Sequence, residues 1–582
     1  MVDVSRRSQP LARHFLETYE DTLKQTAADP LNLRQACLDF MTHFLSDPQK
    51  LADMQMAFYQ DWMRLWQESA RKFMGEATTP LYAPEKGDRR FLAPAWEESA
   101  LFDFIKQSYL LSSRAIKTAV AQVDGIDEET RLKLDFYARQ FVDAIAPTNF
   151  LMTNPEVLQE TMKTHGENLL RGFKNLLDDL ERGGGELAIS TTDYGAFQVG
   201  ENLAVTPGRV IYQNELMQLI QYDPTTKSVF RRPLLIVPPW INKYYILDLR
   251  PDNSFVRWAV AQGHTVFVIS WVNPDKALAQ KRFEDYMRDG VLAAMTQVEA
   301  ATGVSDCNLL GYCLGGTLTA ITLAWLAAEG QVARVASATF LTTMIDFAQS
   351  GEMKLFVDDT QLALLDQEMA EKGVFPGSVL KKTFSLLRAN DLIWSFVVNN
   401  YLMGREPFPF DLLYWNDDAT NMPAAMHSFY LRKCYNENRL PVPGGVTMDG
   451  VPIDMTAVKT PCYFLSTKED HIAPWKATYA GTQLFSAPST FVLAASGHVA
   501  GVINPPAKNK YCFWSGESGS NPEDPDSWLA DARQSEGSWW PHWAGWLAAY
   551  GGGKVSARTP AKGIESAPGR YVQMSLRPPD QP

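Results

Sequence analysis

Apolar residues recur with two different periods along this chain, and the change comes near residue 195. Before that point they recur every three to four residues, which is typical of amphipathic helices. We expect such helices within 51–74, 100–120 and 131–145, and a hinge at "ERGGGELAI" (181–189). The pattern therefore predicts a mainly α-helical N-terminal domain over residues 1–195.

One of these helices carries an aromatic stripe. In "LADMQMAFYQDWMRLWQESARKFM", the residues Met54, Phe58, Trp62 and Leu65 fall on one helical face. The simpler interpretation is that this stripe packs into the protein's own core. The alternative is a docking face for a partner or a hydrophobic particle, because so many large apolar side chains gather there.

After residue 195 the pattern changes to short apolar runs separated by helical segments. "RVIYQN" and "ELMQLIQYD" predict a strand pair. Buried strands rich in branched residues are expected within 233–240, 264–272, 306–313, 335–343, 461–470 and 489–498. This alternation predicts a largely parallel sheet covered by helices on both faces, in a catalytic domain over 196–582. Between about 346 and 450 the segments are helical and aromatic, which indicates a cap insertion, and the tail after about 550 is expected to be irregular.

Composition and charge exclude several classes of protein. The net charge of -13, without a basic block, argues against nucleic-acid binding. No stretch approaches the roughly 18 apolar residues of a membrane span, and "MVDVSRRSQP" lacks the apolar run of a secretory signal. The six cysteines form no CxxC pair, which favours a reducing cytoplasm and no structural metal site.

The stretch "LLGYCLGGTL" (309–318) places a cysteine in the frame G-x-C-x-G. Cys313 lies between a predicted strand and a predicted helix, which is the context of a nucleophile elbow, and Gly311 and Gly315 suit its crowded turn. The helix N-terminus would favour the thiolate form of Cys313. The alternative is a structural cysteine buried in a glycine-packed turn.

Two later strands end in the partners that such a nucleophile needs. Asp470 ends "YFLSTKED" and His498 ends "FVLAASGH", and nucleophile, acid, base is the chain order of the α/β-hydrolase fold. His498 would accept the thiol proton and Asp470 would fix the histidine tautomer. Asp346, at the end of the strand before the cap, is a rival for the acid.

The oxyanion site is expected to use backbone N–H groups. One belongs to Leu314, which follows the nucleophile, and a second belongs to Trp240 or Ile241 in the loop after "LLIVPPW". Cysteine in place of serine favours acyl transfer from a thioester such as an acyl-CoA, because exchange between two thioesters keeps the acyl group activated.

The chain resembles the polyhydroxyalkanoate synthases, and more closely the class I enzymes that make short-chain polyesters such as poly(3-hydroxybutyrate). The stretches that carry this resemblance run from about residue 45 to 572, and they are "SDPQKLADMQMAFYQDWMRLW", "DRRFLAPAWEE", "APTNFLMTNPE", "VPPWINKYYILDL", "GYCLGGTL", "LLYWNDDATNMP", "EDHIAPW", "SGHVAGVINPPAKNKYCFW", "GSWWPHW" and "APGRYV". The polar end "QMSLRPPDQP" departs from the family pattern.

This resemblance implies that Cys313, Asp470 and His498 form a catalytic triad. The implied reaction loads (R)-3-hydroxyacyl-CoA on the cysteine, releases CoA and extends a polyester, without a cofactor or a metal ion. It also implies a cytoplasmic homodimer associated with polymer granules. The resemblance further implies pocket or cap positions for Tyr312, His471, Trp475 and Trp415, and a part in dimer contact for Trp415.

Two other functions compete with polymerisation. A cysteine-type hydrolase or thioesterase of the same fold would admit water in place of a hydroxyl nucleophile, and the aromatic cap argues against it. A granule-coating scaffold built on an inactive hydrolase fold would be expected to lack part of the triad.

Overall fold

The computed structural model describes residues 33–517, 519–560 and 563–574. The chain forms two compact units, Met1–Asp193 with Phe384–Phe408, and Tyr194–Thr383 with Pro409–Pro582. The expectation about the first ten residues, and most of the polar C-terminal end, lie outside the described residues. Among the described residues, no helix combines the length and the apolar character of a membrane span.

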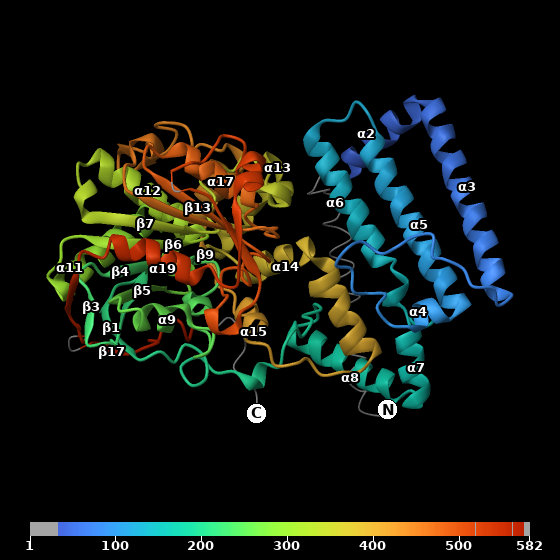
Figure 1. The fold of residues 1–582 in the computed structure, drawn as a ribbon, viewed down its shortest axis with the longest axis horizontal. Coiled ribbons are helices and arrows are strands. Elements are labelled where there is room, and N and C mark those ends of the chain that lie inside the picture. Colours follow the sequence, from blue (N-terminus) through green and yellow to red (C-terminus); the bar gives the residue numbers. More distant parts are fainter. Residues whose placement is uncertain (1–32, 518, 561–562, 575–582) are drawn as a thin grey trace. The chain divides into compact units, whose positions relative to one another are not determined.

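The first unit is helical, as the apolar period predicted. Its α-helices are α2 (Leu33–Ser46), α3 (Pro48–Phe73), α4 (Ala95–Glu98), α5 (Ala100–Gln122), α6 (Glu128–Ala144), α7 (Pro155–Lys163) and α8 (Glu167–Arg182) (Figure 1). Polar residues start several of them, because the Asp47, Ser99 and Asp127 side chains each accept a backbone N–H of the first turn.

The aromatic stripe of α3 packs within this unit. Leu65 is buried and Trp62 lies 6.2 Å from Phe104 of α5, between ring centroids. Phe58 of the stripe is 39% exposed, and other large apolar residues on α3 are exposed as well: Met56, Tyr59, Met63, Trp66 and Phe73. The packing of Trp62 and Leu65 agrees with the interpretation that the stripe belongs to the protein's own core, and the docking interpretation stays a prediction.

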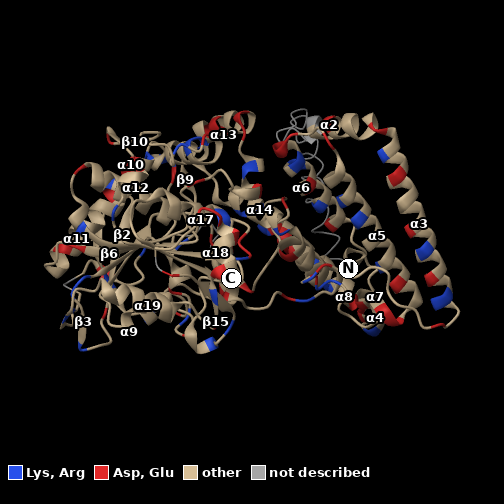
Figure 2. Ribbon diagram, turned by 45° about the horizontal axis from the view of Figure 1, so that its top comes forward, with Lys and Arg blue, Asp and Glu red and all other residues tan. Residues whose placement is uncertain are grey.

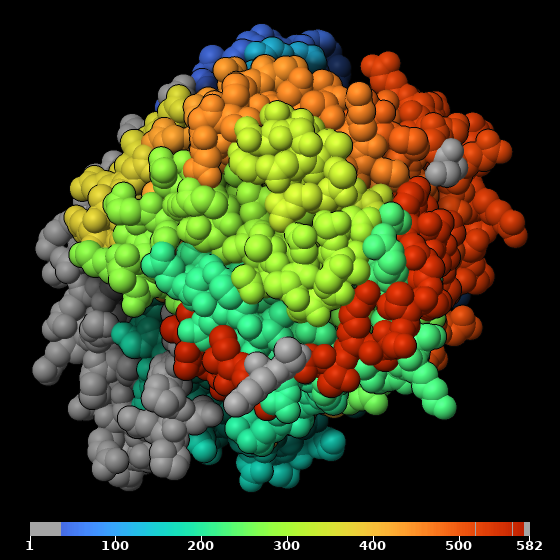
Figure 3. All heavy atoms as spheres, turned by 90° about the vertical axis from the view of Figure 1, so that its left-hand side faces the viewer, coloured from blue at the N-terminus to red at the C-terminus, as the bar shows by residue number. Residues whose placement is uncertain are grey.

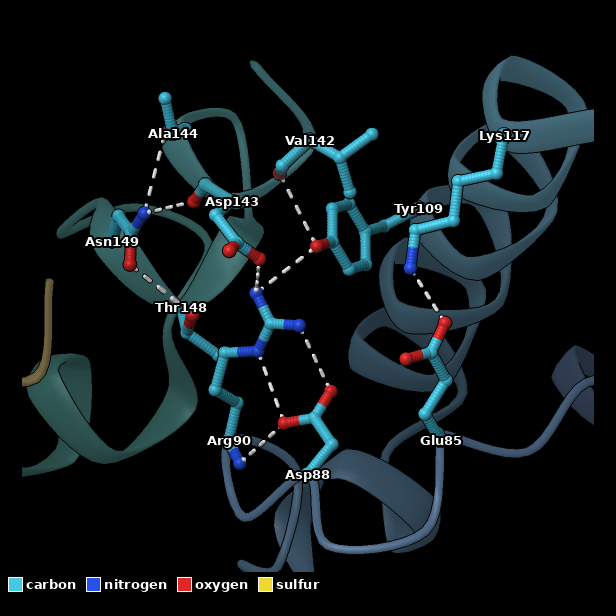
Figure 4. Close-up of polar contacts among 10 residues, drawn as sticks. All are labelled: Glu85, Asp88, Arg90, Tyr109, Lys117, Val142, Asp143, Ala144, Thr148 and Asn149. Carbon is cyan, nitrogen blue, oxygen red and sulfur yellow. Dashed lines mark hydrogen bonds and ion pairs between the residues drawn. The ribbon is translucent and has the colours of Figure 1, made fainter. Parts of the chain in front are cut away.

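A polar cluster joins the loop before α4 to α5 and α6. The guanidinium of Arg90 donates to both carboxylate oxygens of Asp88, at 3.0 and 2.9 Å, and to Asp143 at 3.0 Å (Figure 4). It also donates to the Tyr109 hydroxyl at 3.1 Å, which donates to the Val142 carbonyl. These bonds connect three segments of the helical unit.

The second unit is built on an 11-stranded sheet of order β15-β14-β13-β12-β7-β6-β4-β5-β2-β1-β17. The adjacent strands from β13 to β5 are parallel, and those at both edges are antiparallel. Its strands are β1 (Gly208–Gln213), β2 (Met217–Tyr222), β4 (Leu234–Val237), β5 (Val266–Trp271), β6 (Cys307–Tyr312), β7 (Val335–Leu341), β12 (Cys462–Thr467), β13 (Ser489–Ala494), β14 (Cys512–Ser515), β15 (Arg533–Glu536) and β17 (Glu565–Ser566). Every strand expected from the sequence is present.

Helices cover both faces of this sheet. In Figures 1 and 2, α12 (Leu314–Ala328) and α17 (Trp475–Leu484) lie on one face, and α9 (Phe255–Ala261) and α19 (Trp540–Ala549) on the other. Every residue of the six parallel strands is buried except Ala336 of β7, which is half-buried, and charged residues are scarce along the sheet (Figure 2). This burial explains why the sequences of these strands read as continuous apolar runs.

The segment expected to form the cap differs from its prediction in two ways. Its helices are α13 (Asp359–Lys372), α14 (Gly377–Leu387), α15 (Asp411–Asp417) and α16 (Ala424–Phe429), with π-helical turns at Asn390–Trp394, Val397–Leu402 and Tyr430–Asn436. Short strand pairs also occur, β8 (Val374–Phe375) with β9 (Met422–Pro423) and β10 (Thr447–Met448) with β11 (Val451–Pro452). Two residues are too few to produce a readable period, so no sequence pattern indicated these strands.

The second difference is that Phe384–Phe408 belongs to the helical unit, whereas we expected all of 346–450 to belong to the catalytic domain. Its contacts with α8 explain this membership. The Tyr401 hydroxyl donates to Asp179 at 2.6 Å, and the Asn168 amide donates to the Leu402 carbonyl at 2.8 Å. Such contacts join residues far apart in sequence, which local periodicity does not encode.

The C-terminal tail is irregular for the most part, but it adds two short strands. β16 (Lys554–Ser556) pairs with β3 (Ser228–Phe230), and β17 pairs with β1. In Figure 3 this segment, in red, lies beside the green surface of the earlier strands. The tail therefore closes one edge of the large sheet.

Candidate active site

Cys313 lies in the sharp turn between β6 and α12. Its backbone has φ 51° and ψ -122°, a conformation that L-residues rarely adopt and that is typical of strained functional turns. The Cys313 N–H donates to the Leu341 carbonyl of β7 at 2.8 Å, which holds the turn against the neighbouring strand. The strand, turn and helix are those of a nucleophile elbow.

Glycines around Cys313 permit this turn. A Cβ at Gly311 would lie 2.4 Å from the Cα of Gly316, and a Cβ at Gly315 would lie 2.1 Å from the Val237 carbonyl oxygen. Both distances are far below van der Waals contact, so no side chain fits at either position. The contact of Gly315 also places the end of β4 beside the first turn of α12.

His498 and Asp470 meet next to this turn. The imidazole Nδ1 of His498 lies 2.7 Å from Oδ2 of Asp470, and the imidazole is close enough to Cys313 for the sulfur to act on its pKa. Oδ1 of Asp470 accepts the N–H groups of Ile472 and Ala473, both at 2.8 Å. The structure therefore brings together the three residues that sequence reasoning selected, in the order cysteine, histidine, aspartate.

The charge state of His498 is set by two opposing effects. Burial lowers the pKa of the imidazole, whereas the negative charges of Asp470 and of the Cys313 sulfur raise it, and the net pKa is raised from 6.5 to about 10. At neutral pH this arrangement favours the protonated imidazolium form of His498.

Aromatic side chains enclose the site. The Tyr312 ring stacks on His498, with centroids 5.7 Å apart, and its hydroxyl donates to the His498 carbonyl at 3.3 Å. Tyr430 and Tyr435 come from the cap, and burial, with a smaller effect from the charge at Cys313, raises the pKa of both hydroxyls. Sequence reasoning missed these two tyrosines, whose only signal was the aromatic-rich stretch "SFYLRKCY".

The loop after β4 lies where oxyanion donors were expected. Within the described part of the chain, the backbone N–H groups of Trp240 and Ile241 donate no hydrogen bond. Leu314 is the first residue of α12, so its N–H has no acceptor within the helix. These three N–H groups remain the candidates for an oxyanion site, with Trp240 and Ile241 as alternatives for the second donor.

Other predicted residues have varied surroundings. Asp346 accepts from the Asn438 amide and the Ala348 N–H, both at 2.8 Å, so it is occupied away from His498. His471 and Trp475 follow Asp470 and are half-buried. Trp415 is only 6% exposed and its indole donates to the Lys243 carbonyl at 2.7 Å, which leaves little of its surface for a second subunit.

The thiols of the chain differ in their access to solvent. All six cysteines are unpaired, and Cys313 is one of the two that are half-buried, whereas Cys307, Cys434 and Cys462 are buried. The described residues contain no group of three or more His, Cys, Asp and Glu side chains placed to hold a metal ion. Cys313 therefore combines partial access to solvent with a neighbouring histidine whose pKa it raises.

Comparison with known proteins places this chain in a family. Residues 87–259 match the family model "Poly-beta-hydroxybutyrate polymerase (PhaC) N-terminus", and residues 247–505 match the α/β-hydrolase fold. The chain is 47% identical to a poly(3-hydroxyalkanoate) polymerase of Methylorubrum extorquens, over 98% of this chain and 97% of the relative.

Two further relatives are named as the PhaC subunit of poly(3-hydroxyalkanoate) polymerase. The protein of Rhizobium meliloti is 46% identical over 91% of this chain and 87% of its own length. That of Cupriavidus necator is 45% identical over 92% of this chain and 90% of its own length. With this similarity over nearly its whole length, and with the elbow and its partners in an α/β-hydrolase fold, the chain belongs to the poly(3-hydroxyalkanoate) polymerase family.

Proposed function

We propose that this chain is an acyltransferase that polymerises (R)-3-hydroxyacyl-CoA, with 3-hydroxybutyryl-CoA as the expected monomer, into a polyester with release of CoA. The observation that carries the proposal is a cysteine at the elbow close to His498, which Asp470 orients. The family membership of the chain supports the same reaction.

In the first step, the Cys313 thiolate attacks the thioester carbonyl carbon. Negative charge develops on the carbonyl oxygen, where the N–H of Leu314 and that of Trp240 or Ile241 would stabilise it. The carbon–sulfur bond to CoA then breaks, and the His498 imidazolium gives its proton to the departing thiolate. The acyl group is left on Cys313 as a thioester, and its free energy is nearly the same as in the CoA thioester.

In the second step, the 3-hydroxyl of the next hydroxyacyl-CoA attacks this thioester. Neutral His498 accepts the hydroxyl proton, an ester bond forms, and the Cys313 thiolate leaves. The lengthened chain is itself a CoA thioester and reloads on Cys313 with loss of CoA. No electrons are transferred, so this reaction requires no redox cofactor.

The surroundings of Asp470 favour His498 as the group that takes the hydroxyl proton. The Asp470 side chain is fully buried, and its oxygens accept from Ile472, Ala473, His498 and, at 3.2 Å, the Thr467 hydroxyl. A carboxylate occupied in this way has no access to a substrate hydroxyl. Asp470 therefore acts through His498.

We also propose a cytoplasmic homodimer that is associated with granules of its polymer. The exposed apolar residues of α3 support the granule association, because the product is an apolar, insoluble polyester and an amphipathic helix binds such surfaces through its apolar face. Analytical ultracentrifugation would test the dimer.

The reaction is tested by measuring CoA release from (R)-3-hydroxybutyryl-CoA with the wild type and Cys313→Ala. CoA release with an insoluble polyester, both lost in the variant, is the expected result. Release with only free 3-hydroxybutyrate would mean a thioesterase, the second candidate. No release from either protein would reject this substrate.

A further inference from the structure

The loop after β4 is fastened to the cap by buried contacts. The Lys243 ammonium lies 2.8 Å from Oδ1 of Asp418, and both side chains are at most 5% exposed. Oδ2 of Asp418 also accepts the Tyr245 hydroxyl at 3.0 Å. A buried ion pair needs good geometry to offset its desolvation, so this pair fixes the relative position of the two segments closely.

Uncharged hydrogen bonds reinforce the same connection. The Trp415 indole donates to the Lys243 carbonyl at 2.7 Å, and the Thr420 hydroxyl donates to the Trp240 carbonyl at 2.6 Å. The Asn242 amide donates to the carbonyls of Trp415 and Asn416, at 3.3 and 3.2 Å. Thus three residues of the loop, 240, 242 and 243, are held by residues 415–420.

Asn242 has a backbone φ of 63°, a left-handed conformation that asparagine tolerates better than most residues. It directly follows Trp240 and Ile241, whose N–H groups donate no hydrogen bond among the described residues. The loop conformation therefore leaves these donors available, and the cap contacts on either side of Ile241 keep it in that conformation.

The far end of the cap helix is anchored as well. Asp411, the first residue of α15, accepts from the Arg250 guanidinium and from the Asn253 amide, both at 2.8 Å. The segment that holds the oxyanion loop is thus fixed at both ends of α15, which makes it a rigid support.

We propose that Lys243 and Asp418 are positioning residues that hold the second oxyanion N–H in place, so that acyl transfer depends on the docked position of cap residues 415–420. This inference rests on the proposed function, since the loop matters only if an oxyanion forms at Cys313. The pair acts through the backbone of the loop and does not contact the acyl group.

The test uses the double variant Lys243→Met/Asp418→Asn, which removes both buried charges together. The matched control is Arg232→Met/Asp306→Asn, which removes an ion pair at the opposite, amino-terminal end of β4. Two rates are measured on the full chain: acylation of Cys313 by p-nitrophenyl butyrate, which forms an oxyanion, and alkylation by iodoacetamide, which does not.

We expect acylation to fall about 10- to 100-fold in the Lys243/Asp418 variant, because an oxyanion donor is displaced. Alkylation should stay within about twofold of the wild type, and the control should keep both rates. An acylation rate equal to that of the wild type, or a parallel loss of both rates, would overturn the proposal.

If the double variant does not fold, the same two rates are measured on Trp415→Phe. This substitution removes the indole donor to the Lys243 carbonyl without leaving a buried charge unpaired. A selective loss of acylation supports the proposal and an unchanged rate refutes it. CoA release from (R)-3-hydroxybutyryl-CoA is measured alongside. If the ester acylates the wild type but the wild type releases no CoA, the proposed substrate is rejected. The rates of acylation by the ester then still decide whether Lys243 and Asp418 position the loop.

Discussion

Oδ2 of Asp470 lies 2.7 Å from Nδ1 of His498, while Oδ1 of the same carboxylate accepts two backbone N–H groups. The two carboxylate oxygens therefore have different partners, with the Thr467 hydroxyl at 3.2 Å as a second donor to Oδ2. This arrangement also fixes the tautomer of neutral His498, because Nδ1 has to donate to Asp470 and only Nε2 remains to exchange a proton with Cys313.

Asp470→Asn should therefore leave the fold intact and abolish most of the activity. The amide oxygen would take the place beside the N–H groups of Ile472 and Ala473, which turns the amide NH₂ toward His498. His498 Nδ1 would then have to accept, so Nε2 would carry the proton and could not deprotonate Cys313. Acyl transfer should fall by about two to four orders of magnitude.

Asp346→Asn is the matched control, because Asp346 follows a neighbouring parallel strand but accepts from Asn438 and Ala348. Its CoA release should stay within about threefold of the wild type. A large loss with Asp346→Asn and a small one with Asp470→Asn would reverse the assignment of the acid.

The raised pKa of His498 predicts how stability depends on pH. Because the pKa of about 10 in the folded chain exceeds the ordinary value of 6.5, proton binding to His498 stabilises the folded state. This contribution is fully present below about pH 6.5 and is lost as the pH rises through about 10. The free energy of unfolding, measured with urea from pH 6 to 10, should fall more steeply in the wild type than in His498→Gln.

Cys313→Ala provides the control for that slope, since the charge of the Cys313 sulfur is one of the causes of the raised pKa. Its slope should lie between those of the wild type and His498→Gln. Identical slopes in all three proteins would show that His498 has no raised pKa.

Gly315→Ala should disrupt the elbow. A Cβ there would lie 2.1 Å from the Val237 carbonyl and 2.6 Å from that of Pro238, and neither backbone atom can move without shifting β4. The expected loss in the free energy of unfolding is about 3 kcal/mol or more. Gly545→Ala in α19 is the control, because its Cβ would meet nothing within 4 Å and should stabilise the helix by about 0.5–1 kcal/mol. Urea unfolding of both variants measures the difference.

The sequence predicted the sheet and the three central residues because those features are local. Cys313, Asp470 and His498 each follow a run of apolar residues, and the glycines around Cys313 mark its turn. The fold then brings the ends of parallel strands to one edge, so knowing the strands was enough to bring the residues together.

The remaining features depend on contacts between distant segments. Neither Lys243 nor Asp418 stands out in its own stretch, and their ion pair exists only once the cap packs on the β4 loop. The same holds for Tyr430 and Tyr435 beside the site, and for Phe384–Phe408, which joins the helical unit through α8. Periodicity predicts the helices of the cap but not what they contact.

Arg90 supports the helical unit, and Arg90→Met should weaken it. The substitution would leave Asp88 and Asp143 half-buried without their cation, and burial already raises the pKa of the Asp143 carboxyl (Figure 4). Breaking such a pair costs about 3–5 kcal/mol. Hydrogen exchange of the full chain should show faster exchange in α5 and α6 and unchanged exchange in β6 and β12. Arg71→Met, which removes an exposed ion pair on α3, should leave all four elements unchanged.

The exposed residues of α3 should determine binding to the polymer. Tyr59, Met63 and Trp66 are 59%, 42% and 58% exposed and are spaced by four and three residues, so they form one apolar face. The triple variant Tyr59→Ser/Met63→Ser/Trp66→Ser should bind particles of poly(3-hydroxybutyrate) at least about tenfold more weakly, because each side chain would otherwise bury its apolar surface against the polyester.

A co-sedimentation assay with such particles measures the affinity, and p-nitrophenyl butyrate acylation verifies that the elbow is intact. Val332→Ser/Leu364→Ser/Val442→Ser is the control, because these apolar residues are similarly exposed, at 47%, 43% and 44%, but lie on separate segments of the chain. If both triple variants lost binding equally, attachment would depend on exposed apolar area in general. If neither did, α3 would not be the docking face, and the apolar residues on it would need another partner. A selective loss in the α3 variant, with acylation unchanged, is the result that the spacing of Tyr59, Met63 and Trp66 predicts.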